Sequence, residues 1–184
     1  GYLISAAQDP EVATILLDTA RKQNAKYAFE GVEFGVVERD RAVGGQLLTL
    51  RGLAGEYPEI ELPLHGEHQG QNASLALAAV EAFFGGDRAL ARDVVLAGFA
   101  QVRSPGRLEM IRSEPLVVLD AAHNPHGVRA ASTAFKEAFE LSHVHAVVGI
   151  LGEKDALGIF EVLREEYVDS TDATFRLYLS ASDS

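Results

Sequence analysis

The segment LVVLDAAHNPHG, residues 116–127, carries the pattern from which the fold class of this chain follows. Its first part, LVVLD, has the apolar character of a buried strand, and Asp120 closes that strand. Asn124 and Pro125 are typical of a helix start, because Asn accepts hydrogen bonds from free backbone N–H groups and proline suits the first helical position. A buried strand that leads through a polar loop into a helix is the repeating element of α/β domains.

The sequence on both sides of this segment extends the same pattern. Residues 108–112 predict a strand, and residues 113–115 predict a turn before the LVVLD strand. Downstream, the pattern predicts a buried strand at 145–151, a helix at 156–167 and a third strand at 175–179. Apolar strands that alternate with helices predict a mostly parallel sheet covered by helices.

The preceding part of the chain predicts a different order of helices and strands. Asp9 and Pro10 predict a helix start, with Asp9 as the cap, and residues 32–64 read as strands separated by turns. Residues 72–84, NASLALAAVEAFF, predict a helix that is buried on nearly every side, because its small residues permit close packing against a sheet. A second helix is expected at residues 89–101.

Ser104-Pro105-Gly106 interrupts the helical pattern and marks the best candidate for a domain boundary. We therefore expect two parts, residues 1–104 and residues 105–184. The chain begins with Gly1 and its only methionine is Met110, which leads us to expect an excised piece of a longer protein.

Composition excludes several classes of protein. The 184 residues include 16 basic and 27 acidic side chains, a net charge of −11, without a basic stripe, so no nucleic acid partner is expected. The absence of cysteine excludes disulfides, thiolate nucleophiles and cysteine-bound metals. No apolar run approaches the roughly 20 residues that span a bilayer, and no signal peptide is evident, so we expect a soluble cytoplasmic protein without membrane contact.

The first candidate site is the loop that follows the LVVLD strand. Ligands of open α/β sheets bind beyond the carboxyl ends of the strands, where a helix begins. A carboxylate such as Asp120 accepts ribose hydroxyls there, and an imidazole such as His123 binds or transfers a proton. The other interpretation is structural: Asn124 caps the helix and the histidines are ordinary loop residues.

Two other segments offer polar groups suited to a nucleotide. In HGEHQGQNAS, residues 65–74, the side-chain amide of Asn72 offers the donor and the acceptor that a nucleobase edge requires; the other interpretation is a helix cap. In PGRLE, residues 105–109, the Arg107 guanidinium is suited to phosphate oxygens. A single arginine at a strand start is more often solvated surface.

Together these segments resemble the folylpolyglutamate synthase/dihydrofolate synthase family, a branch of the Mur ligase superfamily. The matching segments cover nearly the whole chain, which makes the set more specific than any single motif. They are YLISAAQDPEV at 2–12, LPLHGEHQGQNASLALAAV at 62–80, SPGRLE at 104–109, LDAAHNPHG at 119–127 and Glu153-Lys154-Asp155.

The resemblance implies an ATP-dependent synthesis of an amide. ATP phosphorylates the carboxylate of folate or dihydropteroate, and the amine of L-glutamate attacks the resulting acyl phosphate. By resemblance, Asn72 contacts the adenine side of ATP, Arg107 its phosphates and Asp120 its ribose. These contacts come from both sides of the Ser104–Gly106 hinge, so the resemblance implies that domain closure assembles the site.

By resemblance, His123 is the catalytic residue, which holds or deprotonates the incoming glutamate. The residues expected near the glutamate are His123, Asn124, Lys154 and Asp155. The phosphate loop, the Mg²⁺ ligands and the modified lysine of the family lie upstream of this region, and no G-x-x-x-x-G-K-[ST] motif occurs in the chain. Residues 1–104 then form the end of a central ATP-binding domain, and residues 105–184 form an incomplete Rossmann-like ligase domain. We expect no metal ligands in this chain and no ligase activity from it alone.

Two alternatives stay open at this point. One is another Mur-type ligase that joins an amino acid to a cell-wall precursor, although Gln69 and Pro105 argue against it. The other is a non-catalytic nucleotide-binding module.

Overall fold

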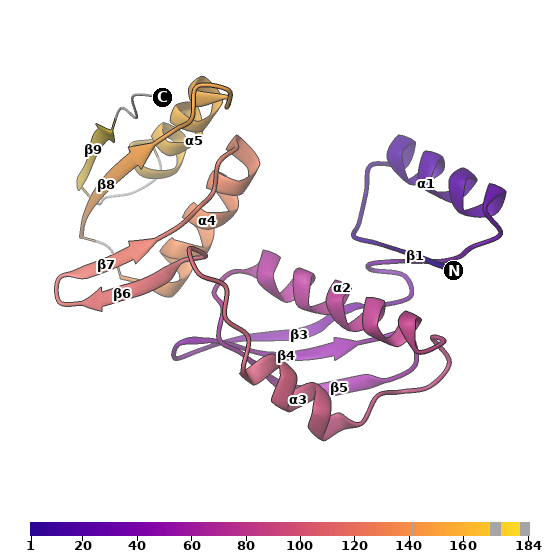
Figure 1. The fold of residues 1–184 in the computed structure, drawn as a ribbon. Helices are drawn as coiled ribbons and strands as arrows, with labels where there is room; N and C mark the ends of the chain where they lie inside the picture. Colours follow the sequence, from indigo (N-terminus) through magenta and orange to yellow (C-terminus); the bar gives the residue numbers. More distant parts are fainter. Residues whose placement is uncertain (141, 170–173, 181–184) are drawn as a thin grey trace. The chain divides into compact units, whose positions relative to one another are not determined.

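The computed structural model describes residues 1–140, 142–169 and 174–180 (Figure 1). Its contacts divide the chain into two compact units, residues 1–103 and residues 104–184. The mixed α/β architecture with parallel strand pairs confirms the predicted fold class. The assignment of the two units to an ATP-binding domain and a ligase domain stays a prediction. Among the described helices, none is both long and apolar enough to cross a membrane.

The first unit opens with a parallel strand–helix–strand element. Strand β1 (Tyr2–Ser5) pairs in parallel with β2 (Lys26–Phe29), and helix α1 (Pro10–Lys22) connects them. Pro10 occupies the first turn of the helix as predicted, where its missing N–H costs no hydrogen bond. Asp9 occupies the N-cap position as predicted, although its side chain makes no capping hydrogen bond.

Three antiparallel strands form the main sheet of the first unit. They are β3 (Gly35–Ala42), β4 (Gly45–Arg51) and β5 (Glu56–Leu62), in the order β3–β4–β5. This arrangement confirms the strand pattern predicted for residues 32–64. Residues 43–44 connect β3 to β4, and residues 52–55 connect β4 to β5. An antiparallel sheet of this kind packs one face against helices.

Helix α2 (Glu67–Phe83) is the centre of the first unit, because it packs against both sheets. One side joins the core formed with β4, β5 and helix α3 (Arg92–Ala100), and another side packs beside the β1–β2 pair. Small residues face both neighbours, with Ala73 in the first core and Ala78 in the second. Alanine at these positions lets the helix approach both sheets closely, and Figure 1 shows α2 lying along the β3–β5 sheet.

Helix α2 differs from the prediction in two respects. It begins at Glu67 rather than at residue 72, because Gly66, with a φ of +96°, turns the chain into the helix. It is also not buried on every side, since Val80 is 46% exposed and Phe83 is 83% exposed. The two sheets cover two sides of the helix, and the described residues leave the remaining side open.

The carboxylate of Glu81, on α2, is fully buried and joins three segments of the first unit. It accepts hydrogen bonds from the backbone N–H groups of Leu53 and Ala54 in the β4–β5 turn and from the Tyr57 hydroxyl, at 2.6 Å. The Tyr57 oxygen in turn accepts a hydrogen bond from the Leu90 N–H at 2.8 Å, ahead of α3. A buried carboxylate is tolerated here because each of its oxygens has partners.

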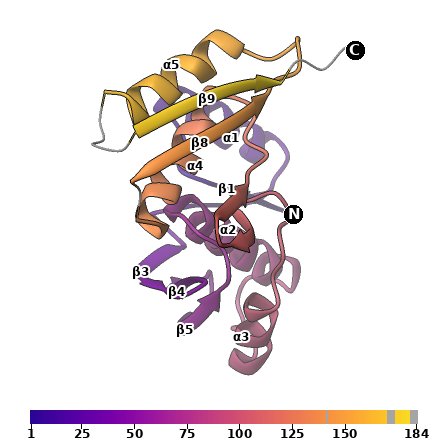
Figure 2. The same cartoon turned by 90° about the vertical axis from the view of Figure 1, so that its left-hand side faces the viewer.

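The second unit combines an antiparallel hairpin with a parallel α/β element. Its elements are, in order, β6 (Glu109–Ser113), β7 (Leu116–Leu119), α4 (Pro125–Ala138), β8 (His143–Gly149), α5 (Ala156–Tyr167) and β9 (Thr174–Ser180). Strands β6 and β7 pair antiparallel, whereas α5 connects β8 to β9 in parallel. Figure 2 shows β8 and β9 side by side, with α4 and α5 behind them.

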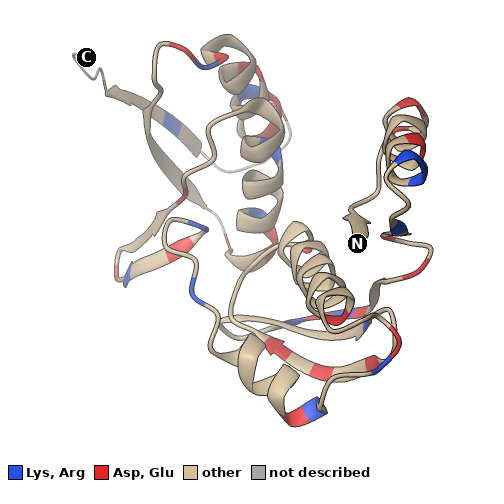
Figure 3. Cartoon of the chain, turned by 45° about the vertical axis from the view of Figure 1, so that its right-hand side comes forward, with Lys and Arg blue, Asp and Glu red and all other residues tan. Residues whose placement is uncertain are grey.

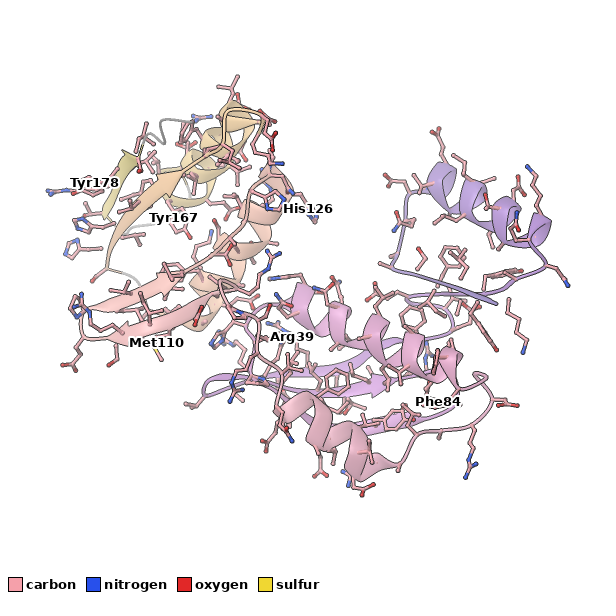
Figure 4. All side chains as sticks on the ribbon, in the orientation of Figure 1. Arg39, Phe84, Met110, His126, Tyr167 and Tyr178 are labelled. Atoms are coloured by element: carbon pink, nitrogen blue, oxygen red, sulfur yellow. The ribbon has the colours of Figure 1, made fainter. Side chains whose placement is uncertain are left out.

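The burial of two strands in the second unit differs from the prediction. Strand β7 is not buried, with Leu116 38% and Leu119 48% exposed, because among the described residues it pairs only with β6. Strand β8 is buried on one face only: Val144 belongs to the core with α4 and α5, whereas His143 and His145 are exposed. His145 stacks on Tyr178 of β9 on this outer face, where Figure 4 labels Tyr178.

Ion pairs join α4 to the last turn of α5. Arg129 of α4 pairs with Glu165 at 2.7 Å and with Glu166 at 3.1 Å, and Lys136 also pairs with Glu166. The Lys136 ammonium lies 5.7 Å from the centre of the Tyr167 ring, a cation–π contact. Figure 3 shows these charges on the two helices. They add to the apolar core that packs α4 against α5.

Replacing Glu81 by Ala is expected to lower the free energy of unfolding of the first unit by about 3 kcal/mol, because three donors lose their acceptor. Urea unfolding, followed through NMR signals of the first unit, measures the change. Glu61→Ala, on an exposed part of β5, is the control and is expected to change this energy by less than about 0.5 kcal/mol. Equal effects of the two substitutions would contradict the role of the buried carboxylate.

The ionisation of Tyr57 provides a second prediction. Burial, followed by the hydrogen bond to Glu81, raises the pKa of Tyr57 from 10.0 to about 12. The folded unit therefore favours the protonated phenol, and this contribution to stability is complete below pH 10 and lost as the pH rises through 12. Titration of tyrosinate absorbance is expected to show a late component that is smaller in Tyr57→Phe; what remains there comes from Tyr167, whose pKa is also raised by burial. Identical titrations of the two proteins would refute the prediction.

Candidate functional site

Asp120 organises the loop between β7 and α4, which carries three of the predicted site residues. One of its carboxylate oxygens accepts a hydrogen bond from the Ala122 N–H at 2.8 Å, and the other accepts one from the Leu108 N–H at 3.0 Å. The Ala121 N–H donates to the Gly106 carbonyl at 2.8 Å. Asp120 therefore ties the β7–α4 loop to the loop that precedes β6.

Arg107 lies in that second loop, between two residues with left-handed backbone conformations. Gly106 has a φ of +70° and Leu108 a φ of +46°. The Leu108 side chain is buried, whereas Arg107 is exposed and its guanidinium makes no hydrogen bond or ion pair with the described residues. An exposed guanidinium presents five N–H donors in a planar fork, which suits phosphate or carboxylate oxygens.

His123 follows in the β7–α4 loop and has one ring nitrogen engaged. Its Nδ1 lies 3.1 Å from the Ala121 carbonyl oxygen. Because a carbonyl oxygen only accepts, this contact places the hydrogen on Nδ1 and the lone pair of the neutral ring on Nε2. The side chain is exposed, so the Nε2 lone pair is accessible to a proton donor. His126, labelled in Figure 4, follows in the first turn of α4 and is also exposed.

The loops that precede α4 and α5 lie at the same end of the second unit, and each contains a residue that caps its helix. The Asn124 side-chain oxygen accepts from the Gly127 N–H at 2.8 Å, and Asp155 accepts from the Gly158 N–H at 2.9 Å. Gly158 lies against the start of α4, since a Cβ there would come within 2.8 Å of Pro125 Cγ. The first turns of α4 and α5 are therefore neighbours. The capping interpretation of Asn124 is confirmed, and its role toward a ligand stays a prediction.

Lys154 precedes α5 in the second of these loops. Its backbone N–H donates to the Leu151 carbonyl at 2.9 Å, which forms a turn. Its ammonium lies 3.4 Å from a carboxylate oxygen of Glu153, whose side chain is 74% exposed. An exposed pair of this kind contributes little energy, so the ammonium can exchange Glu153 for another anionic group.

Asn72 belongs to the first unit and lies in the second turn of α2. Because the helix begins at Glu67, Asn72 is not its cap, so that interpretation is wrong. The side chain is exposed, and its Nδ2 donates to Gln69 Oε1 at 3.4 Å. The buried Gln46 side chain holds the segment that leads into α2, since its Nε2 donates to the carbonyl of Gly66 at 3.0 Å.

Two residues with clear roles were not identified from the sequence. Glu109 accepts a hydrogen bond from the Gly106 N–H at 2.8 Å and so closes the turn that carries Arg107. The available signal was a carboxylate three residues after the glycine of a turn. For Gln46 the sequence carried no signal, because its partners, the carbonyls of Leu64 and Gly66, lie 18 and 20 residues further along, after strand β5.

Residues 106–175 match the family described as Mur ligase, glutamate ligase domain. The chain is 50% identical over 169 residues to the dihydrofolate synthase/folylpolyglutamate synthase of Mycobacterium tuberculosis, covering 91% of this chain and 34% of that protein. It is 32% identical over 146 residues to the folylpolyglutamate synthase of Lacticaseibacillus casei, covering 75% of this chain and 34% of that protein. The chain thus spans about a third of the length of these curated relatives.

The fold is similar to that of solved structures of the same group. With the Mycobacterium tuberculosis folylpolyglutamate synthase, solved in complex with ADP and AMPPCP, the TM-score is 0.88 and the identity 45%, covering 97% of this chain and 38% of that one. With a folylpolyglutamate synthase solved with AMPPCP and folate, the TM-score is 0.80 at 23% identity, covering 96% of this chain and 49% of that one, a likeness of fold alone. The resemblance inferred from the sequence motifs is confirmed.

Asn124→Ala and Asp155→Ala are each expected to lower the free energy of unfolding of the second unit by about 1 kcal/mol, because a first-turn N–H loses its acceptor. Urea unfolding followed through NMR signals of the second unit measures both. His126→Ala, at an exposed position in the same first turn, is the control and is expected to have a smaller effect. A cap variant as stable as this control would contradict the observed capping.

Proposed function

We propose that this chain, which belongs to the folylpolyglutamate synthase/dihydrofolate synthase branch of the Mur ligases, is part of an ATP-dependent ligase that adds L-glutamate to folate or dihydropteroate. The observation that carries the proposal is the 50% identity with such an enzyme over 91% of the chain. In this reaction the γ-phosphoryl group of ATP passes to the substrate carboxylate and ADP leaves. The glutamate amine then attacks the acyl phosphate, and phosphate and a proton are lost. We place this activity in the cytoplasm and assign it to the whole protein, with the chain alone inactive.

In this proposal, the second unit contributes the phosphate and ribose contacts of the nucleotide. The unpaired guanidinium of Arg107 would bind phosphate oxygens through two parallel hydrogen bonds. Asp120 would accept a ribose hydroxyl, because each of its oxygens keeps a lone pair beyond the backbone bond that it already accepts. The hydrogen bond from the Leu108 N–H to Asp120 supports this assignment, because it connects Asp120 to the loop that carries Arg107.

His123 would act on the incoming L-glutamate. The contact of Nδ1 with the Ala121 carbonyl leaves Nε2 to accept the proton that the amine loses. Lys154, whose ammonium is only weakly paired, would attract a carboxylate of the same substrate. Asn124 and Asp155 would shape this end of the unit as caps of α4 and α5.

The first unit would contribute Asn72 as an adenine contact. Its exposed amide, at the surface of α2, offers both a donor and an acceptor. Mg²⁺ would neutralise phosphate charge in the proposed reaction. Within residues 1–140, 142–169 and 174–180, however, no group of three or more His, Asp or Glu side chains could hold a metal ion. We propose that the magnesium ligands come from other parts of the complete protein.

The test is the activity of the complete gene product that contains this chain. It is expected to extend folate in a reaction that requires both ATP and L-glutamate, whereas the 184-residue chain alone is expected not to. Arg107→Ala in the complete protein is expected to lower kcat/KM for ATP about 100-fold, because a charged group that stabilises the transferring phosphoryl is lost. Arg112→Ala, an exposed arginine of β6, is the matched control.

Other outcomes would favour the alternatives. Ligation of amino acids to nucleotide-sugar peptides, with no activity on folates, would identify another Mur-type ligase. Nucleotide binding without turnover by the complete protein would identify a non-catalytic module. Equal effects of Arg107→Ala and Arg112→Ala would remove Arg107 from the proposed site.

A further inference from the structure

We propose that Glu109 is a positioning residue that, together with Asp120, holds the Arg107 loop in its phosphate-binding conformation before any nucleotide arrives. The inference rests on the proposed function, because it takes Arg107 as the phosphate contact. Its new element is the role of Glu109, whose carboxylate bonds the backbone of the loop. Glu109 acts through Arg107 and does not touch the ligand itself.

The backbone on each side of Arg107 is held by a different carboxylate. The Gly106 N–H donates to Glu109 Oε2 at 2.8 Å, and the Leu108 N–H donates to Asp120 Oδ2 at 3.0 Å. The Arg107 N–H itself donates to the Ser104 carbonyl at 3.2 Å. Three successive N–H groups therefore have fixed partners, and Arg107 cannot shift without breaking at least one of these bonds.

The conformation of the loop needs such restraint. Leu108 has a φ of +46°, and a left-handed conformation costs a non-glycine residue roughly 1–2 kcal/mol. Residues of this kind persist only where the surrounding contacts over-determine them. The buried Leu108 side chain and the two carboxylates supply that restraint. Because the backbone around the exposed Arg107 is restrained in this way, the arginine is preorganised for binding.

The two carboxylates bond the backbone and not the guanidinium. Among the described residues, Arg107 forms an ion pair with neither Glu109 nor Asp120. A phosphate would therefore meet an arginine whose backbone is already ordered and whose side chain has no ion pair to break. Both features lower the cost of binding, since less freedom is lost and no existing contact is given up.

Two substitutions separate the reach of Glu109 from its charge. Glu109→Gln keeps the side-chain length and an amide oxygen that can accept from Gly106, but it loses the charge. Glu109→Asp keeps the charge but is one methylene shorter. We expect Glu109→Asp to speed hydrogen exchange of the Gly106 amide and to weaken AMPPCP binding about five- to tenfold, and Glu109→Gln to change the affinity less than about twofold.

In the complete gene product, the NMR exchange rate of the Gly106 amide measures the first quantity, and titration with AMPPCP measures the second. Glu161→Asp, an exposed position of α5, is the matched control and is expected to change neither. Weaker binding in Glu109→Gln but not in Glu109→Asp would overturn the positioning role in favour of a charge effect. Unchanged exchange and binding in Glu109→Asp would also overturn it.

The nucleotide contact and the positioning role fail on different results. If the complete protein without substitutions does not bind AMPPCP, or if Arg107→Ala binds it as tightly as the unsubstituted protein does, the proposed nucleotide contact fails and the positioning role fails with it. If the complete protein binds AMPPCP and Glu109→Asp binds it equally well, only the positioning role fails. Weaker binding with faster Gly106 exchange in Glu109→Asp alone supports both.

Discussion

The structure of the second unit depends on the Asp120 carboxylate where β7 leads into α4. Asp120 directly follows β7, and its carboxylate accepts hydrogen bonds from the N–H of Ala122 ahead of α4 and from the N–H of Leu108 ahead of β6. One side chain thereby sets the geometry of both loops that meet there. Because backbone N–H groups occupy one lone pair on each oxygen, the carboxylate remains able to accept another donor. A structural role and a binding role are compatible in the same residue for this reason.

In the first unit, too, a single carboxylate holds several segments together by hydrogen bonds. Helix α2 contacts two sheets, so the β4–β5 turn and the segment ahead of α3 must be held at one end of the helix. The Glu81 carboxylate does this from inside the protein, with the Tyr57 hydroxyl extending its reach to Leu90. A buried charge is costly unless it is fully bonded, so this arrangement specifies the positions of all three segments at once. By contrast, Asp120 is exposed, and its bonds restrain the loops without excluding water.

Local chemistry explains which features were predictable from the sequence. Helix α5 covers the predicted residues 156–167, and Asn124 caps α4, because apolar spacing and capping act over a few residues. The predicted burial of β7 was wrong, because burial depends on what packs over a strand and not on its own residues. The resemblance predicted the candidate site residues, but it did not predict the hydrogen bonds that hold the loops carrying them. The Glu109 bond spans three residues and left a local signal, whereas the Asp120 bond joins residues 12 positions apart, a spacing that follows no period.

The two helix starts of the second unit are not equivalent as places for an anionic group. Each helix begins with N–H groups that lack partners within the helix, and these carry partial positive charge. Asn124 satisfies one of them at α4 with a neutral amide, whereas Asp155 does so at α5 with a carboxylate that offsets the positive end. The start of α4 therefore keeps more of its partial positive charge than the start of α5 does. It is also the start that the Asp120 carboxylate connects to the Arg107 loop.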